Sequence, residues 1–270
     1  MIEGIVLGVI QGVAEWIPVS SEGMIALVEI NFFGKSGIEE IIHLALFLHM
    51  GTFLAALIYL RKDVIRVLKS LFRYKASFQE EKRLLRFLVV STAISSILGF
   101  LILRSVSGLE SEVEFSGRIF TATIGVFLLV TAWLQLKKQV SNAEIRKKEG
   151  DMSTKDSVIL GLAQGMAVLP GISRSGLTVS ALLLRRVEDE AALRLSFLMS
   201  LPIVFFGNIF LNFGTFVNPG SISSIQLWGL AFSFIFGLAA IHFLIKLARK
   251  INFGYFVGIF GFLMILSVLV

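Results

Sequence analysis

A short polar stretch, Ser173-Arg174-Ser175 followed by Thr178, stands between two apolar runs of the sequence. An arginine among hydroxyl groups has no favourable place in hydrocarbon, and a charge at membrane depth indicates a functional site. The guanidinium is a planar fork that matches phosphate or carboxylate oxygens, and a helix that begins here would add free backbone N–H groups. The stretch therefore predicts an oxyanion site, with a plain surface loop as the alternative.

A second polar stretch, near the N-terminus, supplies a carboxylate and two hydroxyl groups. Gln11 and Glu15 are four residues apart, so they share one face of a helix. Their oxygens suit a hard cation such as Mg²⁺ or Ca²⁺, but Glu15 could instead act as a general base or make a helix-packing hydrogen bond. Ser20 and Ser21 follow, and either could be a nucleophile beside a base or the N-cap of the next helix.

The composition indicates that both stretches belong to an integral membrane protein. Apolar residues make up 56% of the 270 positions and charged residues 16%, and no cysteine is present. Apolar segments near the roughly 20 residues that a spanning helix needs recur along the chain, at 41–60, 87–103, 119–136, 195–213, 225–245 and 253–270. The net charge of +6 gathers in loops, so it reports topology rather than a nucleic-acid partner.

The distribution of Lys and Arg predicts which loops share a side of the membrane. Basic residues concentrate at 61–86, 137–155, 185–194 and 246–251, which the positive-inside rule places in the cytoplasm. Cytoplasmic loops then flank 156–184 on both sides, so this segment, with Pro170-Gly171 in its middle, is predicted to be a re-entrant hairpin. Residues 1–29 are similarly broken, and a second hairpin there puts both termini outside.

The two halves of the chain carry a repeated pattern. Gly8-x-x-Gln11-Gly12-x-Ala14 matches Gly161-x-x-Gln164-Gly165-x-Ala167 at a constant offset of 153 residues, and three spans follow each copy. The predicted fold is an all-α integral membrane protein with an inverted-topology repeat, made of six transmembrane helices and two re-entrant helix hairpins whose tips converge. The repeats are 1–136 and 137–270; chance similarity between glycine-rich segments is the alternative.

The motifs also carry a family resemblance. Gln11-x-x-x-Glu15 and Trp16-Ile-Pro18-Val-Ser20-Ser21-x-Gly23 resemble the first motif region of the undecaprenyl-diphosphate phosphatase family, also called BacA or UppP. Pro170-Gly-Ile-Ser173-Arg174-Ser175-Gly-Leu-Thr178 fits the second motif at every fixed position. The resemblance implies a multi-pass enzyme of the cell membrane that hydrolyses a polyprenyl diphosphate to the monophosphate and recycles the lipid carrier of envelope glycans. It also implies a divalent cation and a site open toward the outer face.

One position departs from that family. The family usually has a catalytic His after the glycine that corresponds to Gly23, and this chain has Met24, which carries neither a proton nor a charge. Glu22 or His49 could take over an acid–base role. An isolated His in a span is more often a helix–helix hydrogen bond.

These observations lead to two functional hypotheses. In the first, a phosphatase, Arg174 binds phosphate, Gln11 and Glu15 hold a cation or position the substrate, and Ser21 or an activated water attacks phosphorus with Glu15 or Glu22 as base. The remaining phosphate ligands are expected among the hydroxyl groups of Ser20, Ser173, Ser175 and Thr178. In the second, the same anion site serves a polyprenyl-phosphate transporter or flippase, because broken helices in inverted repeats also mark transporters. A homodimer is left open.

Overall fold

The computed structural model describes residues 1–34, 38–106, 122–123, 125–130, 132–133, 136, 146–169, 172–211 and 222–269. Several predicted features lie outside these residues: part of the span at 119–136, most of the segments at 105–117 and 214–224, the basic residues at 137–145, and Pro170-Gly171.

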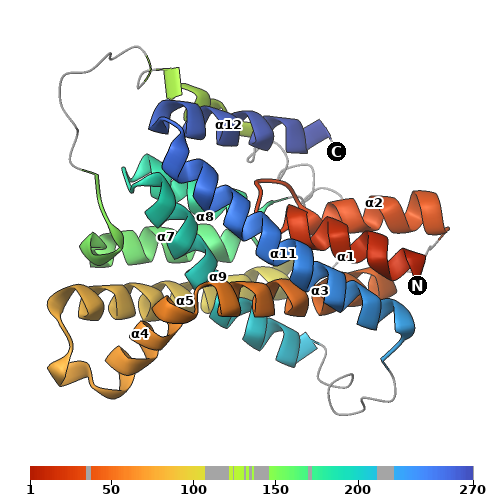
Figure 1. Ribbon diagram of the computed structural model, residues 1–270, viewed down its shortest axis with the longest axis horizontal. Coiled ribbons are helices and arrows are strands. Elements are labelled where there is room, and N and C mark those ends of the chain that lie inside the picture. The colour runs from red at the N-terminus through yellow and green to blue at the C-terminus, as the bar shows by residue number, and fades with distance from the viewer. Residues whose placement is uncertain are drawn as a thin grey trace.

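The described chain is built from α-helices, with no β-strand within these ranges (Figure 1). The helices are α1 (Ile2–Ala14), α2 (Ser21–Phe33), α3 (Ile38–Tyr59), α4 (Arg61–Phe72), α5 (Gln79–Val106), α7 (Thr154–Met166), α8 (Arg174–Leu184), α9 (Asp189–Leu211), α11 (Ser224–Lys250) and α12 (Phe253–Leu266). Short 3-10 turns are η1 (Tyr74–Ala76), η2 (Glu149–Asp151) and η4 (Ser267–Leu269). The prediction of an all-α protein is confirmed.

Four helices are long and apolar enough to cross a membrane, and they agree with four of the predicted spans. They cover Glu40–Tyr59, Gln79–Ser105, Asp189–Ile209 and Ser224–Lys250. The segment predicted as the last span differs, because α12 has 14 residues and rises only about 21 Å. That length is less than the hydrocarbon thickness of about 30 Å, although η4 extends the helical stretch. The chain is therefore a multi-pass membrane protein.

Two pairs of short helices, α1–α2 and α7–α8, are each separated by a non-helical break. In both pairs a serine is the N-cap of the second helix, as the capping preference of serine predicts. Ser20 Oγ accepts from Gly23 N at 3.2 Å, and Ser173 Oγ accepts from Gly176 N at 3.1 Å. Each cap fixes the direction in which the chain leaves its break.

Matched glycines bring α1 against α11 and α7 against α5. A Cβ added at Gly8 would lie 2.5 Å from the Gly229 carbonyl oxygen, and one added at Gly161 would lie 2.9 Å from the Ser91 carbonyl oxygen. Small residues permit such close backbone contact between helices in membranes. The repeated glycines therefore position the two short helices that lead into the breaks.

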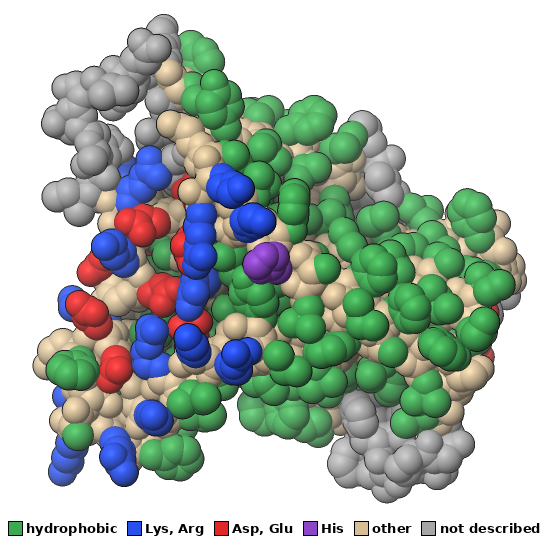
Figure 2. Space-filling view, in the orientation of Figure 1, with side chains coloured by type: hydrophobic (Ala, Val, Ile, Leu, Met, Phe, Trp, Pro, Cys, Tyr) green, Lys and Arg blue, Asp and Glu red, His purple; other side chains and the backbone are tan. Residues whose placement is uncertain are grey.

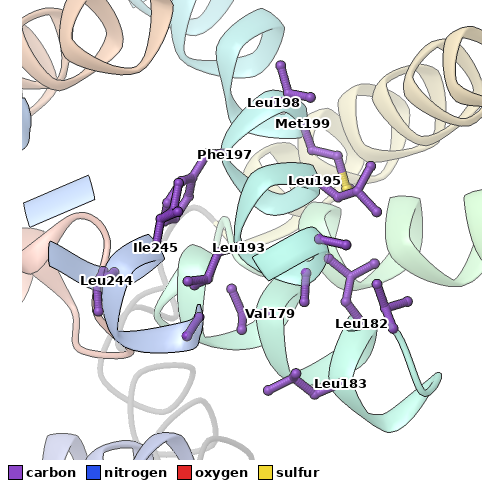
Figure 3. Close-up of a cluster of buried hydrophobic side chains, with 14 of the residues drawn as sticks. Val179, Leu182, Leu183, Leu193, Leu195, Phe197, Leu198, Met199, Leu244 and Ile245 are labelled. Atoms are coloured by element: carbon purple, nitrogen blue, oxygen red, sulfur yellow. The ribbon is translucent and has the colours of Figure 1, made fainter. Parts of the chain in front are cut away.

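An apolar cluster surrounds α8 and connects it to α9 and α11. Figure 3 shows α8 residues Val179, Leu182 and Leu183 among Leu193, Leu195 and Phe197 of α9, with Leu244 and Ile245 of α11 nearby. Trp16, in the first break, packs edge-on against Phe197 with ring centroids 4.7 Å apart. The same packing thus supports both breaks.

Charged side chains gather at one end of the molecule, while apolar side chains cover most of the rest of the face in Figure 2. The gathered charges form ion pairs between segments that are distant in sequence, including Arg66–Glu149 at 3.7 Å, Arg194–Glu149 at 2.8 Å, Arg249–Glu190 and Arg185–Asp156 at 2.7 Å. Lys147 adds a local pair with Asp156 at 2.8 Å. The described parts of the four basic loops thus meet at one end, as expected for loops that share one side of a membrane.

Candidate functional site

The two helix breaks meet through a partly buried ion pair. Arg174, the first residue of α8, donates from Nη2 to Oε1 of Glu15, which immediately follows α1. Beside it, the hydroxyl groups of Ser173 and Ser175 donate to the Ile17 carbonyl oxygen at 3.4 and 2.8 Å. The second break is therefore hydrogen-bonded to the first, and the residues predicted to carry chemistry come together from both halves of the chain.

Glu15 is the centre of this cluster. It is buried, and its Oε2 accepts from Gln11 Nε2 at 2.9 Å and from Ser21 Oγ at 3.1 Å. The first contact follows from the four-residue spacing on α1, and the second arises because Ser21 is the first residue of α2. A hydroxyl group that donates to a buried carboxylate has the arrangement expected of a nucleophile beside a base.

His49 approaches the same carboxylate from α3. Its Nε2 lies 3.1 Å from Glu15 Oε2, and its Nδ1 lies 2.7 Å from the Ala45 carbonyl oxygen. A carbonyl oxygen only accepts, so Nδ1 carries a proton and Nε2 is the ring atom that faces the site. The structure therefore brings His49, one of the two acid–base candidates, into contact with Glu15.

Glu22, the other candidate, lies in the first turn of α2 with an exposed side chain. It is close enough to His49 to interact with it electrostatically. Met24 is half-buried one half-turn further along the same helix.

One arm of Arg174 is available for a ligand. Its Nη1 is buried and has no hydrogen-bond partner among the described residues. A buried donor without a partner costs free energy, and a guanidinium arm suits a phosphate oxygen. Gln11 Oε1 is also buried and unpartnered within the described residues, so the cluster has one free donor and one free acceptor.

The other predicted phosphate ligands have structural contacts. Ser20 and Ser173 are the N-caps described above, and Ser175 donates to Ile17. Thr178 Oγ1 is fully buried, lies 2.8 Å from the Arg174 carbonyl oxygen and is 2.6 Å from Ser196 Oγ on α9. Sequence reasoning missed Ser196, which belongs to no motif, and the Ile17 carbonyl, a backbone group inside the first motif whose contact with the second break depends on tertiary packing.

The two residues expected to hold a cation make contacts with protein groups. Gln11 and Glu15 are adjacent, as predicted, but Gln11 presents its amide nitrogen to Glu15. The carboxylate also receives Ser21 and pairs with His49 and Arg174. Among the residues that the structure describes, no group of three or more His, Cys, Asp or Glu side chains could hold a metal ion.

Fold and site together define a multi-pass helical membrane protein in which a buried carboxylate pairs with a partly buried guanidinium where two helix breaks meet. Residues 4–266 match the family model described as "Bacitracin resistance protein BacA". The chain belongs to this family, which confirms the resemblance seen in its motifs.

Similar proteins named undecaprenyl-diphosphatase cover nearly the whole chain. The protein of Methanococcoides burtonii is 44% identical over 98% of this chain and 97% of its own length. That of Haloarcula marismortui is 38% identical over 95% of this chain and 93% of its own length. That of Saccharolobus solfataricus is 33% identical over 98% of this chain and 94% of its own length.

Proposed function

We propose that the protein is a membrane phosphatase that hydrolyses an undecaprenyl-type diphosphate to the monophosphate and phosphate. The full-length similarity to proteins named undecaprenyl-diphosphatase supports this activity. The observation that carries it is the buried, unpartnered Nη1 of Arg174, next to a carboxylate, a hydroxyl and an imidazole. The protein thereby recycles the lipid carrier of envelope glycans in the cell membrane. No observation on the described residues favours the transporter alternative.

Binding begins at Arg174. Its free Nη1 takes a non-bridging oxygen of the terminal phosphoryl group, while Nη2 stays directed at Glu15. Ser173 and Ser175 donate to the Ile17 carbonyl oxygen, and turning either hydroxyl hydrogen toward the phosphoryl group would give that group a second kind of donor. Positioned positive charge and hydrogen-bond donors supply most of the stabilisation in phosphoryl transfer.

The attacking oxygen comes from Ser21 or from a water molecule beside it. Ser21 Oγ donates to Glu15 Oε2, so the carboxylate takes the proton as the new P–O bond forms. The bond from phosphorus to the bridging oxygen breaks, and the prenyl monophosphate leaves. If Ser21 attacks, water then hydrolyses the phosphoserine. Trapping a phosphoserine at Ser21 in acid-quenched enzyme would separate the two routes.

His49 supplies the imidazole that the family resemblance leads one to expect at Met24. Its Nδ1 is held by the Ala45 carbonyl and its Nε2 faces the site, so the imidazolium form, with a proton on both nitrogens, can donate from Nε2 to the bridging oxygen of the leaving group. Glu22, which is exposed, assists by attracting positive charge to this side of the site.

The divalent cation is proposed to enter with the substrate. Mg²⁺ is usually bound by one or two carboxylates together with substrate phosphates. Gln11 Oε1, the free acceptor of the cluster, is the protein oxygen available to it, and Ca²⁺ could use the same ligand. When bound, the cation neutralises diphosphate charge.

The finer topology is also part of this proposal: six spans, two re-entrant hairpins in inverted repeats, and both termini outside. The support lies in the helix contacts. The glycines of α1 meet residues 229, 232 and 236, and those of α7 meet 91, 94 and 98, which have the same spacing. In addition, α1 and α7 have 13 residues each and rise about 20 Å, too short to cross hydrocarbon of about 30 Å. Both end at a break, whereas α12 continues directly into η4.

The activity is tested by phosphate release from a C55 prenyl diphosphate, using purified protein in detergent with and without Mg²⁺ or Ca²⁺. Release that depends on Glu15 supports the proposal. Folded protein that binds the lipid without releasing phosphate contradicts it and favours lipid carriage.

A further inference from the structure

Helix α4 buries two polar side chains against the protein and exposes four of its six apolar side chains. Asp63 and Ser70 are each 1% exposed, whereas Leu68 is 47% and Phe72 82% exposed. This is the reverse of a surface helix in water, which buries its apolar stripe. Ile65 is also half-exposed and lies three residues before Leu68 and seven before Phe72. The three side chains therefore form one continuous apolar stripe.

Polar contacts fix α4 in this orientation. Asp63 Oδ2 accepts from Arg194 of α9, and Ser70 Oγ lies 3.5 Å from Glu81 Oε2 of α5. Rotating the helix to bury its apolar stripe would break both contacts and leave the Asp63 carboxylate without its guanidinium partner on α9, with only Arg66 of its own helix nearby. The outward stripe is therefore built into the fold.

A row of cations runs beside the apolar stripe. Lys62, Lys69 and Arg73 are exposed and are spaced by seven and four residues, which aligns them along one flank of the helix. None of the three forms an ion pair with a carboxylate in the described part of the chain. A helix with an apolar face, a basic flank and low overall hydrophobicity is suited to the interface of an anionic membrane.

The position of α4 in the molecule matches that chemistry. It follows α3, a candidate span, with Leu60 alone between them, and η1 leads from it to α5, another candidate span. Figure 1 shows α4 at the end of these two helices, and Figure 2 shows charged residues gathered at that end of the molecule. The ends of spanning helices lie at the height of lipid headgroups.

We propose that α4 is an interfacial anchor that binds anionic lipid headgroups in the leaflet at the charged end of the molecule. Ile65, Leu68 and Phe72 insert between acyl chains, and the cationic flank binds headgroup phosphates. This surface is separate from the site at the helix breaks, and it requires neither catalysis nor that site's substrate.

The absence of cysteine from the sequence gives a direct test. Leu68→Cys and Phe72→Cys are labelled with a fluorophore in vesicles that contain brominated lipids, which quench on contact. Lys155→Cys, at an exposed position at the start of α7 whose neighbours Ser153 and Thr154 are exposed and polar, is the matched control. We expect strong quenching at positions 68 and 72 and weak quenching at 155.

The headgroup preference is measured with the Leu68→Cys label. Brominated phosphatidylglycerol and brominated phosphatidylcholine are compared at the same low mole fraction. We expect the anionic lipid to be enriched about fivefold around the label, which corresponds to the attraction of one cation at a bilayer surface. The enrichment should disappear at high salt and in the variant that combines Lys62→Gln, Lys69→Gln and Arg73→Gln.

Three results would overturn the proposal. Quenching at position 68 no stronger than at 155 would show that the stripe is outside the membrane. Equal quenching by the two lipids in the Leu68→Cys protein would show that the flank does not select anionic headgroups. Disulfide-linked dimers of the unlabelled Leu68→Cys protein, together with no quenching of the labelled form, would show that a second copy of the chain covers the stripe.

Discussion

At the scale of single residues, the proposed chemistry depends on one carboxylate. Glu15 contacts a hydroxyl, an amide, an imidazole and a guanidinium, so any change there affects both the base and the phosphate-binding arginine. The spacing of Gln11 and Glu15 is enough to predict that these two meet. The contact with His49 could not be predicted, because α3 reaches Glu15 only through tertiary packing and no local pattern links the two positions.

The choice of base is tested by Glu15→Gln. The amide keeps the shape of the side chain but cannot take the proton from Ser21 or water, so kcat should fall by about 10²- to 10⁴-fold. Glu22→Gln is the control, since the Glu22 side chain is exposed, and its kcat should fall by less than about tenfold. A larger loss in Glu22→Gln than in Glu15→Gln would assign the base to Glu22.

The role of His49 is tested by His49→Gln with two substrates. Loss of an acid that protonates the leaving group should lower kcat on prenyl diphosphate by about 10²-fold or more. The loss should be much smaller on p-nitrophenyl phosphate, whose leaving group needs no proton. His242→Gln, an exposed histidine that contacts Tyr59, should match the unmodified protein. Equal losses on both substrates would indicate a structural role for His49.

A second change asks whether the imidazole can act from α2. In the His49→Gln background, Met24→His should restore at least about tenfold of the lost rate, if one imidazole near Glu15 is what the site requires. If the double variant folds but its rate does not recover, an imidazole at position 24 is not equivalent to one at position 49.

At the scale of helices, the repeated glycines determine how closely the short helices approach the long ones. The glycine pattern and the apolar runs are local features, so the sequence predicts the helices, four of the spans and the two breaks. It does not predict that α1 packs on α11 while α7 packs on α5. In both pairs a short helix of one half packs on a long helix of the other half, and this depends on how the two halves assemble.

This close packing makes Gly8→Ala costly. Its new methyl group would meet the Gly229 carbonyl oxygen at 2.5 Å, and backbone atoms cannot move aside as a flexible side chain can. Overpacking of this kind costs about 1–3 kcal/mol, so the melting temperature in detergent should fall. Gly207→Ala in α9 is the control, since no described atom beyond the backbone of its own helix lies within 4 Å of the added methyl group. Equal melting temperatures for the two variants would contradict the packing argument.

At the scale of the whole molecule, ion pairs connect the segments at the charged end. The basic residues of this end are evident in the sequence, but their partners are not, because Asp63–Arg194 and Asp156–Arg185 join positions far apart in the chain. Burial alone would raise the pKa of Asp156, but hydrogen bonds from Lys147, Ser153 and Arg185 outweigh it and hold that pKa well below its usual range.

The low pKa of Asp156 predicts how stability depends on pH. A carboxyl group with a lower pKa in the folded state stabilises it when ionised. This contribution is complete above the unfolded pKa of about 3.9 and is lost as the pH falls toward the folded value. Asp156→Asn should lower the melting temperature at pH 7 and weaken the acid-induced loss of stability below about pH 4. Unchanged stability at pH 7 would contradict the assignment.

The central claim is that Arg174 binds the phosphoryl group with its free arm, and phosphate release from a C55 prenyl diphosphate tests it most directly. Arg174→Ala should lower release by at least about 10²-fold. Arg174→Lys keeps the charge but loses the planar fork, so its release rate should lie between those of Arg174→Ala and the unmodified protein. Arg249→Ala, at the exposed surface of the charged end, should retain full release. Folded Arg174→Ala protein that releases phosphate within about tenfold of the unmodified rate would contradict the claim.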